Sequence, residues 1–316
     1  MEPTIEPLEP ITAAPEIDDG YQKVLANRHV QMIAFGGAIG VGLFLGSAQR
    51  LQTTGPGLVF AYAVAGLAAF FVMRALCELE FWFAALKVQN PRKVLPRAIN
   101  GVIGRIAIFY VGSILLLVLV LPWTVYRAGE SPFVTVFGAL GVPAIGGIMN
   151  TVVLTAAMSS CNSGLYSTGR ILRALADEGE ARAFTGRMSA RQIPYGGIFL
   201  TALVYLAGVV LNAVVPSDAF DIATSVASLG VLSTWTALLY CQIQLRGRAE
   251  RGELRRPGFR MPGSPWTNWA TLVFLAFIIV EMCFDHTQRL AVLCIPPLAL
   301  VLWIGWRAIR ARDLRS

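Results

Sequence analysis

The sequence predicts an all-α protein that crosses a membrane several times. Hydrophobic residues make up 55% of the 316 residues and charged residues only 14%, and the mean hydropathy is +0.61. An ordinary soluble domain carries about 25% charged residues. The apolar residues are also gathered into runs of about 20, the length that a helix needs to cross the hydrocarbon core. We therefore expect a polytopic helical membrane protein.

About eight segments are long and apolar enough to be spanning helices. A ninth apolar piece, residues 81–88, is too short to span, and it is either a re-entrant piece, an interfacial stub or an extension of the second helix. The eight predicted spans cover residues 30–48, 57–79, 103–123, 142–167, 195–215, 222–244, 266–284 and 290–306.

The ends of the chain differ from the spans in composition. Residues 1–19 are acidic and rich in proline, which predicts a disordered tail rather than a signal peptide. We expect a cytoplasmic tail over residues 1–27, a transmembrane domain over 28–310 and a second cytoplasmic tail over 311–316.

The basic residues of the loops predict the orientation. They gather in alternate loops and near the C-terminus, whereas the opposite side carries only Arg50, Arg127 and Arg289. Because cytoplasmic loops carry the excess of Lys and Arg, both termini are expected to be cytoplasmic. The net charge of +7 follows from this bias, and contact with anionic lipid explains it better than nucleic-acid binding does.

The first span contains a run of glycines, FGGAIGVGLFLG, at residues 35–46. Glycine weakens a helix and lets the backbone approach a neighbour closely, and unpaired backbone in a membrane is tolerated only beside a cavity or inside protein. The run is therefore either a broken helix around a small solute or a glycine-rich face that packs on another helix.

The fourth span carries polar residues at helical spacing. Ser159, Asn162, Ser163 and Tyr166 recur at intervals of three and four residues, so they share one helix face. That face could hydrogen-bond either a polar solute or a neighbouring helix, and the second use is the commoner one.

The sequence lacks the motifs of enzymes and of ATP-driven pumps. The chain contains no Gly-Lys-Ser/Thr phosphate loop, no nucleophile with a suitable histidine partner and no set of metal ligands in the sequence. We therefore expect neither an enzyme nor an ATP-driven pump, and no metal or other cofactor. A secondary transporter is the leading class, and the charged cluster of Glu78, Glu80 and Lys87 is either solvated or coupled to it.

Several stretches carry distinctive motifs: GYQKVLANRH at residues 20–29, MIAFGGAIGVGLFLG at 32–46, NPRKVLPRAIN at 90–100, SPFV at 131–134, NSGLYSTGR at 162–170 and RPGFRMPGSP at 256–265. Together they resemble the bacterial amino-acid permeases of the amino acid/polyamine/organocation superfamily. Residues 20–46 are similar to the family's entry, and residues 90–100 to the loop before its seventh helix. Residues 131–134 and 162–170 resemble the family's eighth helix, and residues 256–265 the loop before helix eleven, most of all in L-asparagine permeases.

This resemblance implies a fold of two inverted five-helix repeats plus two more helices, with the substrate held between broken helices one and six. It also implies the site residues. The carboxylate of the amino acid would be received by the free backbone amides of Gly37, Ala38, Ile39, Gly40, Val41 and Gly42. The eighth helix would line the solute path with Ser159, Asn162 and Ser163. Lys87 would stand in for a cation in proton coupling.

The resemblance further implies a truncated version of the inverted-repeat (5+5) fold. Residues 74–79 resemble the end of the family's second helix, residues 79–88 the start of its fifth, and Gln89 onward the loop after its sixth. Helices three to six are therefore largely missing, with junctions near residues 79–90. Loss of an even number of spans preserves the orientation of later helices, but the second broken helix is lost.

The expected activity is that of the family: secondary active, proton-coupled uptake of L-asparagine or a related small amino acid across the cytoplasmic (inner) membrane. The alternative is a transport-inactive remnant that acts as a partner of a full-length permease. A complementing homo-oligomer ranks last, because both copies would lack helix six.

Overall fold

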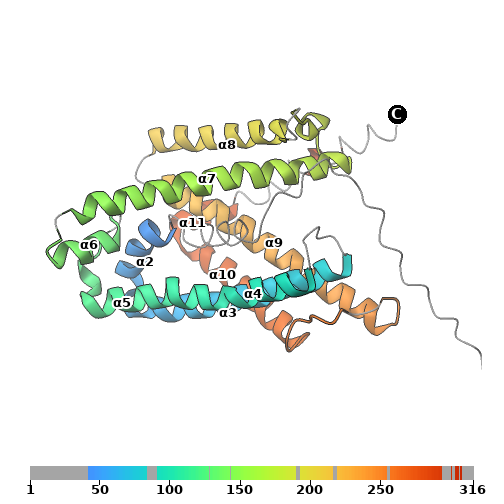
Figure 1. Ribbon diagram of the computed structural model, residues 1–316, viewed down its shortest axis with the longest axis horizontal. Helices are drawn as coiled ribbons and strands as arrows, with labels where there is room; N and C mark the ends of the chain where they lie inside the picture. Colours follow the sequence, from blue (N-terminus) through green and yellow to red (C-terminus); the bar gives the residue numbers. More distant parts are fainter. Residues whose placement is uncertain are drawn as a thin grey trace, which may run out of the picture.

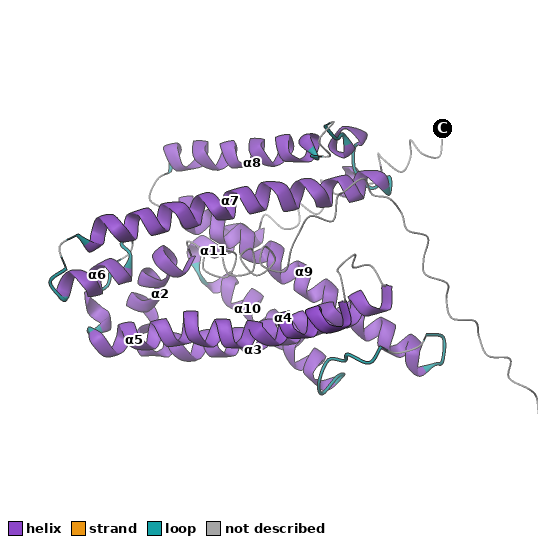
Figure 2. Ribbon diagram, in the orientation of Figure 1, coloured by secondary structure: helices purple, strands orange, loops and turns teal. Residues whose placement is uncertain are grey.

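The computed structural model describes residues 42–83, 91–127, 129–142, 144–189, 193–215, 219–254 and 257–293, with Leu300, residues 303–305 and Arg307. All regular structure within these ranges is helical, which confirms the predicted all-α class (Figure 2). The elements are η1 (Gly42–Gly46), α2 (Ser47–Thr54), η2 (Gly55–Gly57), α3 (Leu58–Phe83), α4 (Pro91–Ile106), η3 (Ala107–Gly112), α5 (Ser113–Val120), η4 (Trp123–Val125), α6 (Pro132–Ala139), α7 (Ile145–Asp177), η5 (Ala183–Gly186), α8 (Tyr195–Val214), α9 (Ala219–Glu250), α10 (Trp266–Phe284) and α11 (His286–Leu293).

Five helical stretches of the described residues are long and apolar enough to cross a membrane, by length and composition alone. Each matches one predicted span, so the multi-pass architecture is confirmed. The predicted spans 30–48 and 290–306 lie mostly outside the described residues. The five stretches are Ser47–Leu79, Ile99–Val120, Tyr195–Val214, Ala219–Glu250 and Trp266–Phe284.

The helix α7 corresponds to the predicted span 142–167 but differs from the other five. It is 33 residues long, ample for a membrane crossing, yet it is not among the five apolar stretches. Polar residues such as Asn150, Ser160 and Asn162 interrupt its apolar sequence. The length of α7 therefore agrees with the predicted span, whereas its polar residues distinguish it from the five apolar stretches.

Two boundaries differ from the sequence-based expectation. The second span continues as α3 through Phe83, so residues 81–83 extend that helix, while residues 84–90 lie outside the described part. Residues 91–100, expected to be loop, are helical from Pro91 onward, so that expectation is wrong. Proline at the first helical position needs no backbone N–H and has a suitable φ, which explains the early start.

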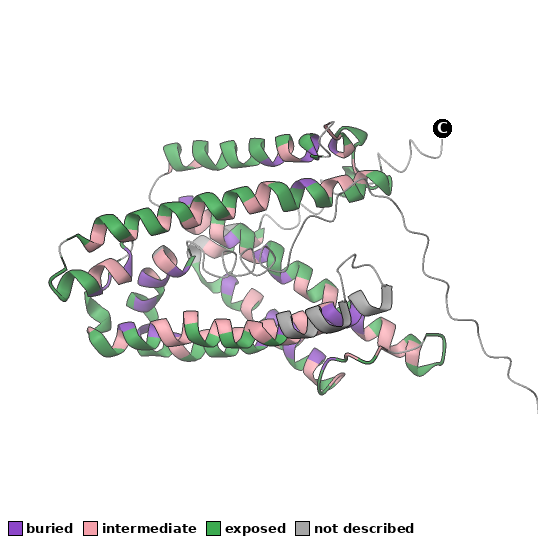
Figure 3. Cartoon of the chain, viewed as in Figure 1, coloured by how far each residue is buried: buried purple, intermediate pink, exposed green. Residues whose placement is uncertain are grey.

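The helices form two groups with a crossing pair between them. Figure 1 shows α3 beside α4 and α5 along one side and α7 beside α8 along the other, with α9 and α10 between. Many large apolar side chains of the spans are exposed, for example Val209 at 64% and Phe277 at 56%, and exposed residues run along α7 and α8 (Figure 3). Such outward apolar faces suit a lipid environment, where no hydrophobic effect drives the helices together.

Two buried clusters hold the first group and the crossing helices. The first joins α3, α9, α10 and the loop before α10; the second joins α2, α3, α5, α6 and the segment after η4. The first comprises Val72, Ala75, Leu229, Leu232, Leu239, Met261, Leu275 and Met282, and the second Leu51, Leu58, Ile114, Leu117, Tyr126 and Val136.

Tyr126 completes the second cluster. Its side chain is fully buried, and its hydroxyl donates a hydrogen bond of 2.6 Å to the carbonyl oxygen of Leu117. Burial raises the pKa of this phenol above its ordinary value. The bond ties the chain after η4 back to α5.

The pair α7–α8 is joined by glycines rather than by large side chains. A Cβ placed on Gly197 would lie 2.8 Å from both Cα and the carbonyl oxygen of Gly169, closer than real Cβ contacts allow. A Cβ on Gly169 would lie 2.9 Å from Cγ1 of Ile198. The two backbones can approach this closely only without side chains at these positions.

We predict that Gly197→Val separates α7 from α8 and lowers the melting temperature of the detergent-solubilised protein. The matched control is Gly208→Ala, on the same helix, because a Cβ there meets nothing within 4 Å. Thermal unfolding followed by fluorescence-detected size-exclusion chromatography measures both. Equal melting temperatures for the two variants would contradict the assignment of this interface.

Candidate functional site

Only the last part of the glycine run, residues 42–46, lies within the described residues. Gly37, Ala38, Ile39, Gly40 and Val41 lie outside the described residues. Gly42 begins η1, a five-residue π-helix that leads directly into α2. It is exposed, and a Cβ built on it would meet nothing within 4 Å. No described residue therefore fills the space beside the backbone here, and short π-helical turns within helices frequently mark functional sites.

The helix that follows the run is fixed at two points. Gln49 Nε2 donates a hydrogen bond of 3.2 Å to Asp221 Oδ2 in the first turn of α9. The rings of Phe44 and Phe133 lie 5.4 Å apart, which connects η1 to α6. Through these contacts α6 and α9 position the backbone that leaves the glycine run.

The polar face of α7 is present as the sequence predicts. Ser159, Asn162 and Ser163 all lie within the one helix, Ser159 and Asn162 exposed and Ser163 half-buried. Tyr166 is also exposed, and the guanidinium of Arg170 lies 5.8 Å from its ring centroid. Because nothing lies within 4 Å of a Cβ at Gly42, the structure does not bring that glycine against these side chains.

The helix α7 also packs on α8. Its glycines contact α8, and the Tyr205 hydroxyl of α8 donates a hydrogen bond of 3.4 Å to the carbonyl oxygen of Cys161. Gly169 lies seven positions after Asn162, so this packing reaches the side of α7 that carries Asn162. Ser159 and Asn162 themselves are exposed.

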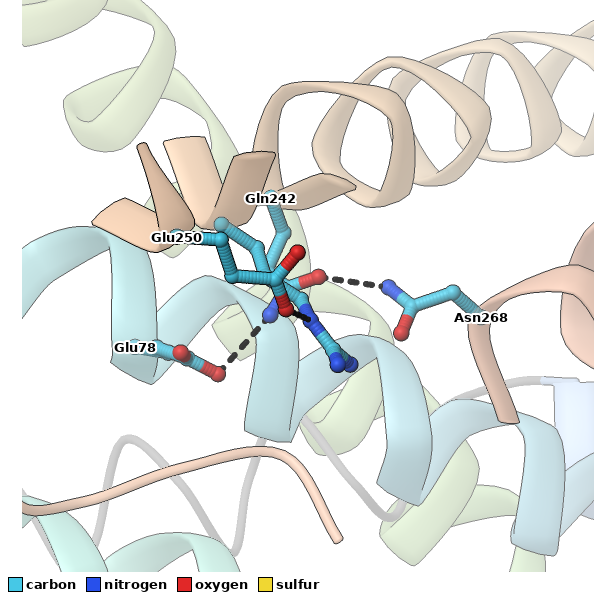
Figure 4. A network of polar contacts seen from close by, with 5 residues as sticks. Glu78, Gln242, Glu250 and Asn268 are labelled. Atoms are coloured by element: carbon cyan, nitrogen blue, oxygen red, sulfur yellow. Dashed lines mark hydrogen bonds and ion pairs between the residues drawn. The ribbon is translucent and has the colours of Figure 1, made fainter. Parts of the chain in front are cut away.

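A third polar group is fully buried, and sequence reasoning identified only one of its members. Glu78 is 0% exposed, and its Oε2 accepts hydrogen bonds of 2.9 Å from Gln242 Nε2 and from the backbone N–H of Met261. Gln242 Oε1 in turn accepts a bond of 2.7 Å from Asn268 Nδ2 (Figure 4). The structure thus places Glu78 away from solvent, while Lys87 lies outside the described residues.

The missed residues had a recognisable signal. Gln242 and Asn268 each lie inside a predicted apolar span, where a polar side chain is costly unless it has a partner. Among the described residues, no group of three or more His, Cys, Asp or Glu side chains could hold a metal ion.

Comparison with known proteins identifies the family. The sequence model of the family described as amino acid permease matches residues 29–87 and 81–315. The chain belongs to the amino acid permease family. The two matched stretches share residues 81–87.

Three curated relatives carry the name L-asparagine permease. The protein of Escherichia coli is 34% identical, over 93% of this chain and 90% of its own length. That of Streptomyces coelicolor is 36% identical, over 93% and 92%, and L-asparagine permease 1 of Mycobacterium tuberculosis is 34% identical, over 93% and 91%. These relatives are permeases rather than enzymes. No solved structure matches this amino acid permease.

The lengths of these alignments confirm a shortened permease. Each alignment extends over 449 positions, whereas the chain has 316 residues. The relatives therefore carry well over a hundred residues that have no counterpart here. The two family matches overlap at residues 81–87, within the region where the sequence predicts the junctions.

We predict that Gln242→Leu destabilises this permease by about 2 kcal/mol or more, because it removes a donor from a buried carboxylate and an acceptor from Asn268. Gln244→Leu is the matched control, since that side chain is exposed and donates a hydrogen bond of 3.0 Å to the Tyr240 hydroxyl one turn earlier. Thermal unfolding in detergent measures both variants. A loss of stability that is no larger for Gln242→Leu than for Gln244→Leu would contradict the importance of the buried network.

Proposed function

We propose that the chain is a secondary active transporter that imports L-asparagine or a related small amino acid together with protons. The observation that carries this proposal is the similarity to three proteins named L-asparagine permease, at 34–36% identity over 93% of the chain. The family match includes the glycine run, since it begins at residue 29. The substrate assigned by those names is the natural first candidate here.

The proposed site joins a backbone cradle to a polar helix face. The free amides of residues 37–42 would bind the carboxylate of the amino acid, because unpaired N–H groups at a helix break favour an anion. The side chains of Ser159, Asn162 and Ser163 would hydrogen-bond the rest of the solute. The open space at Gly42 and the exposure of Ser159 and Asn162 support this arrangement.

The proposal also includes the coupling ion and the membrane in which the protein lies. Protons are the proposed coupling ion, and Lys87 is the proposed coupling residue by its resemblance to the family's fifth-helix lysine. The excess of basic residues in alternate loops supports a cytoplasmic (inner) membrane location with both termini in the cytoplasm.

A second candidate function is that of a transport-inactive protein that associates with a full-length permease or with another copy of itself. Two observations favour it: the alignment leaves more than a hundred positions of the relatives without a counterpart, and the polar face of α7 is exposed. A half-site makes fewer contacts with a solute, and exposed polar side chains in lipid favour association with another helix.

Uptake of radiolabelled L-asparagine by a permease-deficient bacterial host distinguishes the two functions. The chain is expressed beside the double variant Gly40→Leu, Gly42→Leu and the control Gly208→Leu, whose site is open and lies on α8. Membrane levels are quantified for all three. We expect uptake by the native chain and the control that is abolished in the double variant, because leucine side chains cover the amides.

The result that would contradict autonomous transport is an absence of uptake from a chain present in the membrane at the control level, for L-asparagine and for a panel of other amino acids. Co-purification of that inactive chain with a full-length permease would then support the second function.

A further inference from the structure

The last turns of α3 contact three consecutive residues of the loop that precedes α10. Arg74 Nη2 donates a hydrogen bond of 2.7 Å to the carbonyl oxygen of Arg260, and its guanidinium carbon lies 3.8 Å from the ring centroid of Phe259. Glu78 Oε2 accepts a bond of 2.9 Å from the backbone N–H of Met261. Three successive groups of the loop therefore contact α3: the ring of Phe259, the carbonyl oxygen of Arg260 and the backbone amide of Met261.

The geometry of α3 explains how two residues can do this. Arg74 and Glu78 are four positions apart, so they project from the same face on successive helical turns. The planar guanidinium can stack on an aromatic ring and donate in its own plane at once. Beyond the backbone contact, the Met261 side chain is 2% exposed and belongs to the cluster of α3, α9 and α10.

The same two side chains extend the contact to further helices. Arg74 Nη1 donates a bond of 3.3 Å to Asn100 Oδ1 on α4. Through Gln242 of α9, Glu78 is connected to Asn268 of α10, and all three side chains are 0% exposed. Figure 4 shows the carboxylate and the two amides in one line across these helices.

We propose that Arg74 and Glu78 form a permanent clamp that keeps α3, α4, α9, α10 and residues 259–261 together as one rigid unit. Opening the clamp would leave a buried carboxylate and two buried amides without these partners in a medium of low dielectric, which is strongly unfavourable. The α7–α8 pair lies outside this unit and is joined by close glycine packing instead. This goes beyond the proposed transport function, because it states which helices keep their mutual arrangement.

The test measures protection of position 261 with a maleimide. The natural cysteines are replaced by alanine, and Met261→Cys is compared with Gly258→Cys in the same loop, an exposed site with nothing within 4 Å of a Cβ. The protein is reconstituted in lipid nanodiscs, so both faces are accessible. We expect Met261→Cys to react about tenfold or more slowly than Gly258→Cys, as a site protected by a closed contact should.

Two further comparisons connect this protection to the clamp. Adding Glu78→Ala should bring the reaction rate of Met261→Cys close to that of Gly258→Cys, whereas Glu281→Ala, an exposed carboxylate on α10, should leave it unchanged. If Glu78→Ala does not yield folded protein, Arg74→Lys replaces it, because lysine keeps the charge but loses the planar stack and the second donor; it should raise the rate several-fold.

The addition of L-asparagine decides whether the clamp is permanent. We expect the rate at position 261 to be the same with and without it. A Met261→Cys that reacts as fast as Gly258→Cys, an unchanged rate in the folded Glu78 or Arg74 variant, or a rate that rises with L-asparagine would each overturn the proposal. Because labelling needs no uptake, failure of the clamp and failure of transport are separate results.

Discussion

Polar groups in a membrane must find their partners inside the protein, and this constraint governs the described structure. The hydroxyls of the spans follow it locally. Ser225 and Thr236 of α9, for example, donate to the carbonyl oxygen one turn earlier, at 2.7 and 2.8 Å. The carboxylate of Glu78 accepts hydrogen bonds from outside its own helix, from Gln242 of α9 and from the backbone of Met261 before α10, and so connects α3, α9 and α10. The apolar side chains on the outer faces of the helices can contact lipid directly and need no partner within the protein.

The sequence predicts those features that depend on the chain locally. Apolar runs of about 20 residues predict the five spans, and spacing by three and four predicts the shared face of Ser159 and Asn162. Features that depend on distant residues could not be predicted. Gln242 bonds to a carboxylate 164 positions away, and the close approach of Gly197 to Gly169 joins two helices whose contact no local pattern specifies. The start of α4 at Pro91 was also not predicted, because residues 90–100 resemble a loop of the family.

The internal loss of helices has unequal consequences for the two halves of the molecule. The cluster of α3, α9 and α10 has both an apolar core and a polar network, and the buried members of both lie outside residues 79–90, where the sequence predicts the junctions. The polar face of α7, by contrast, is exposed. The described helices therefore keep a buried scaffold, and the proposed substrate binding and the proposed association with another chain would both use the exposed polar face of α7.

The measurement that tests this account most directly is equilibrium binding of labelled L-asparagine to the purified protein in nanodiscs, with Asn162→Ala beside the control Asn212→Ala, an exposed amide on α8. The account predicts saturable binding that is about fivefold weaker in Asn162→Ala, the loss of roughly one hydrogen bond, and unchanged in the control. Absence of saturable binding by well-folded protein, or equal affinities for all three chains, would contradict a substrate site on α7.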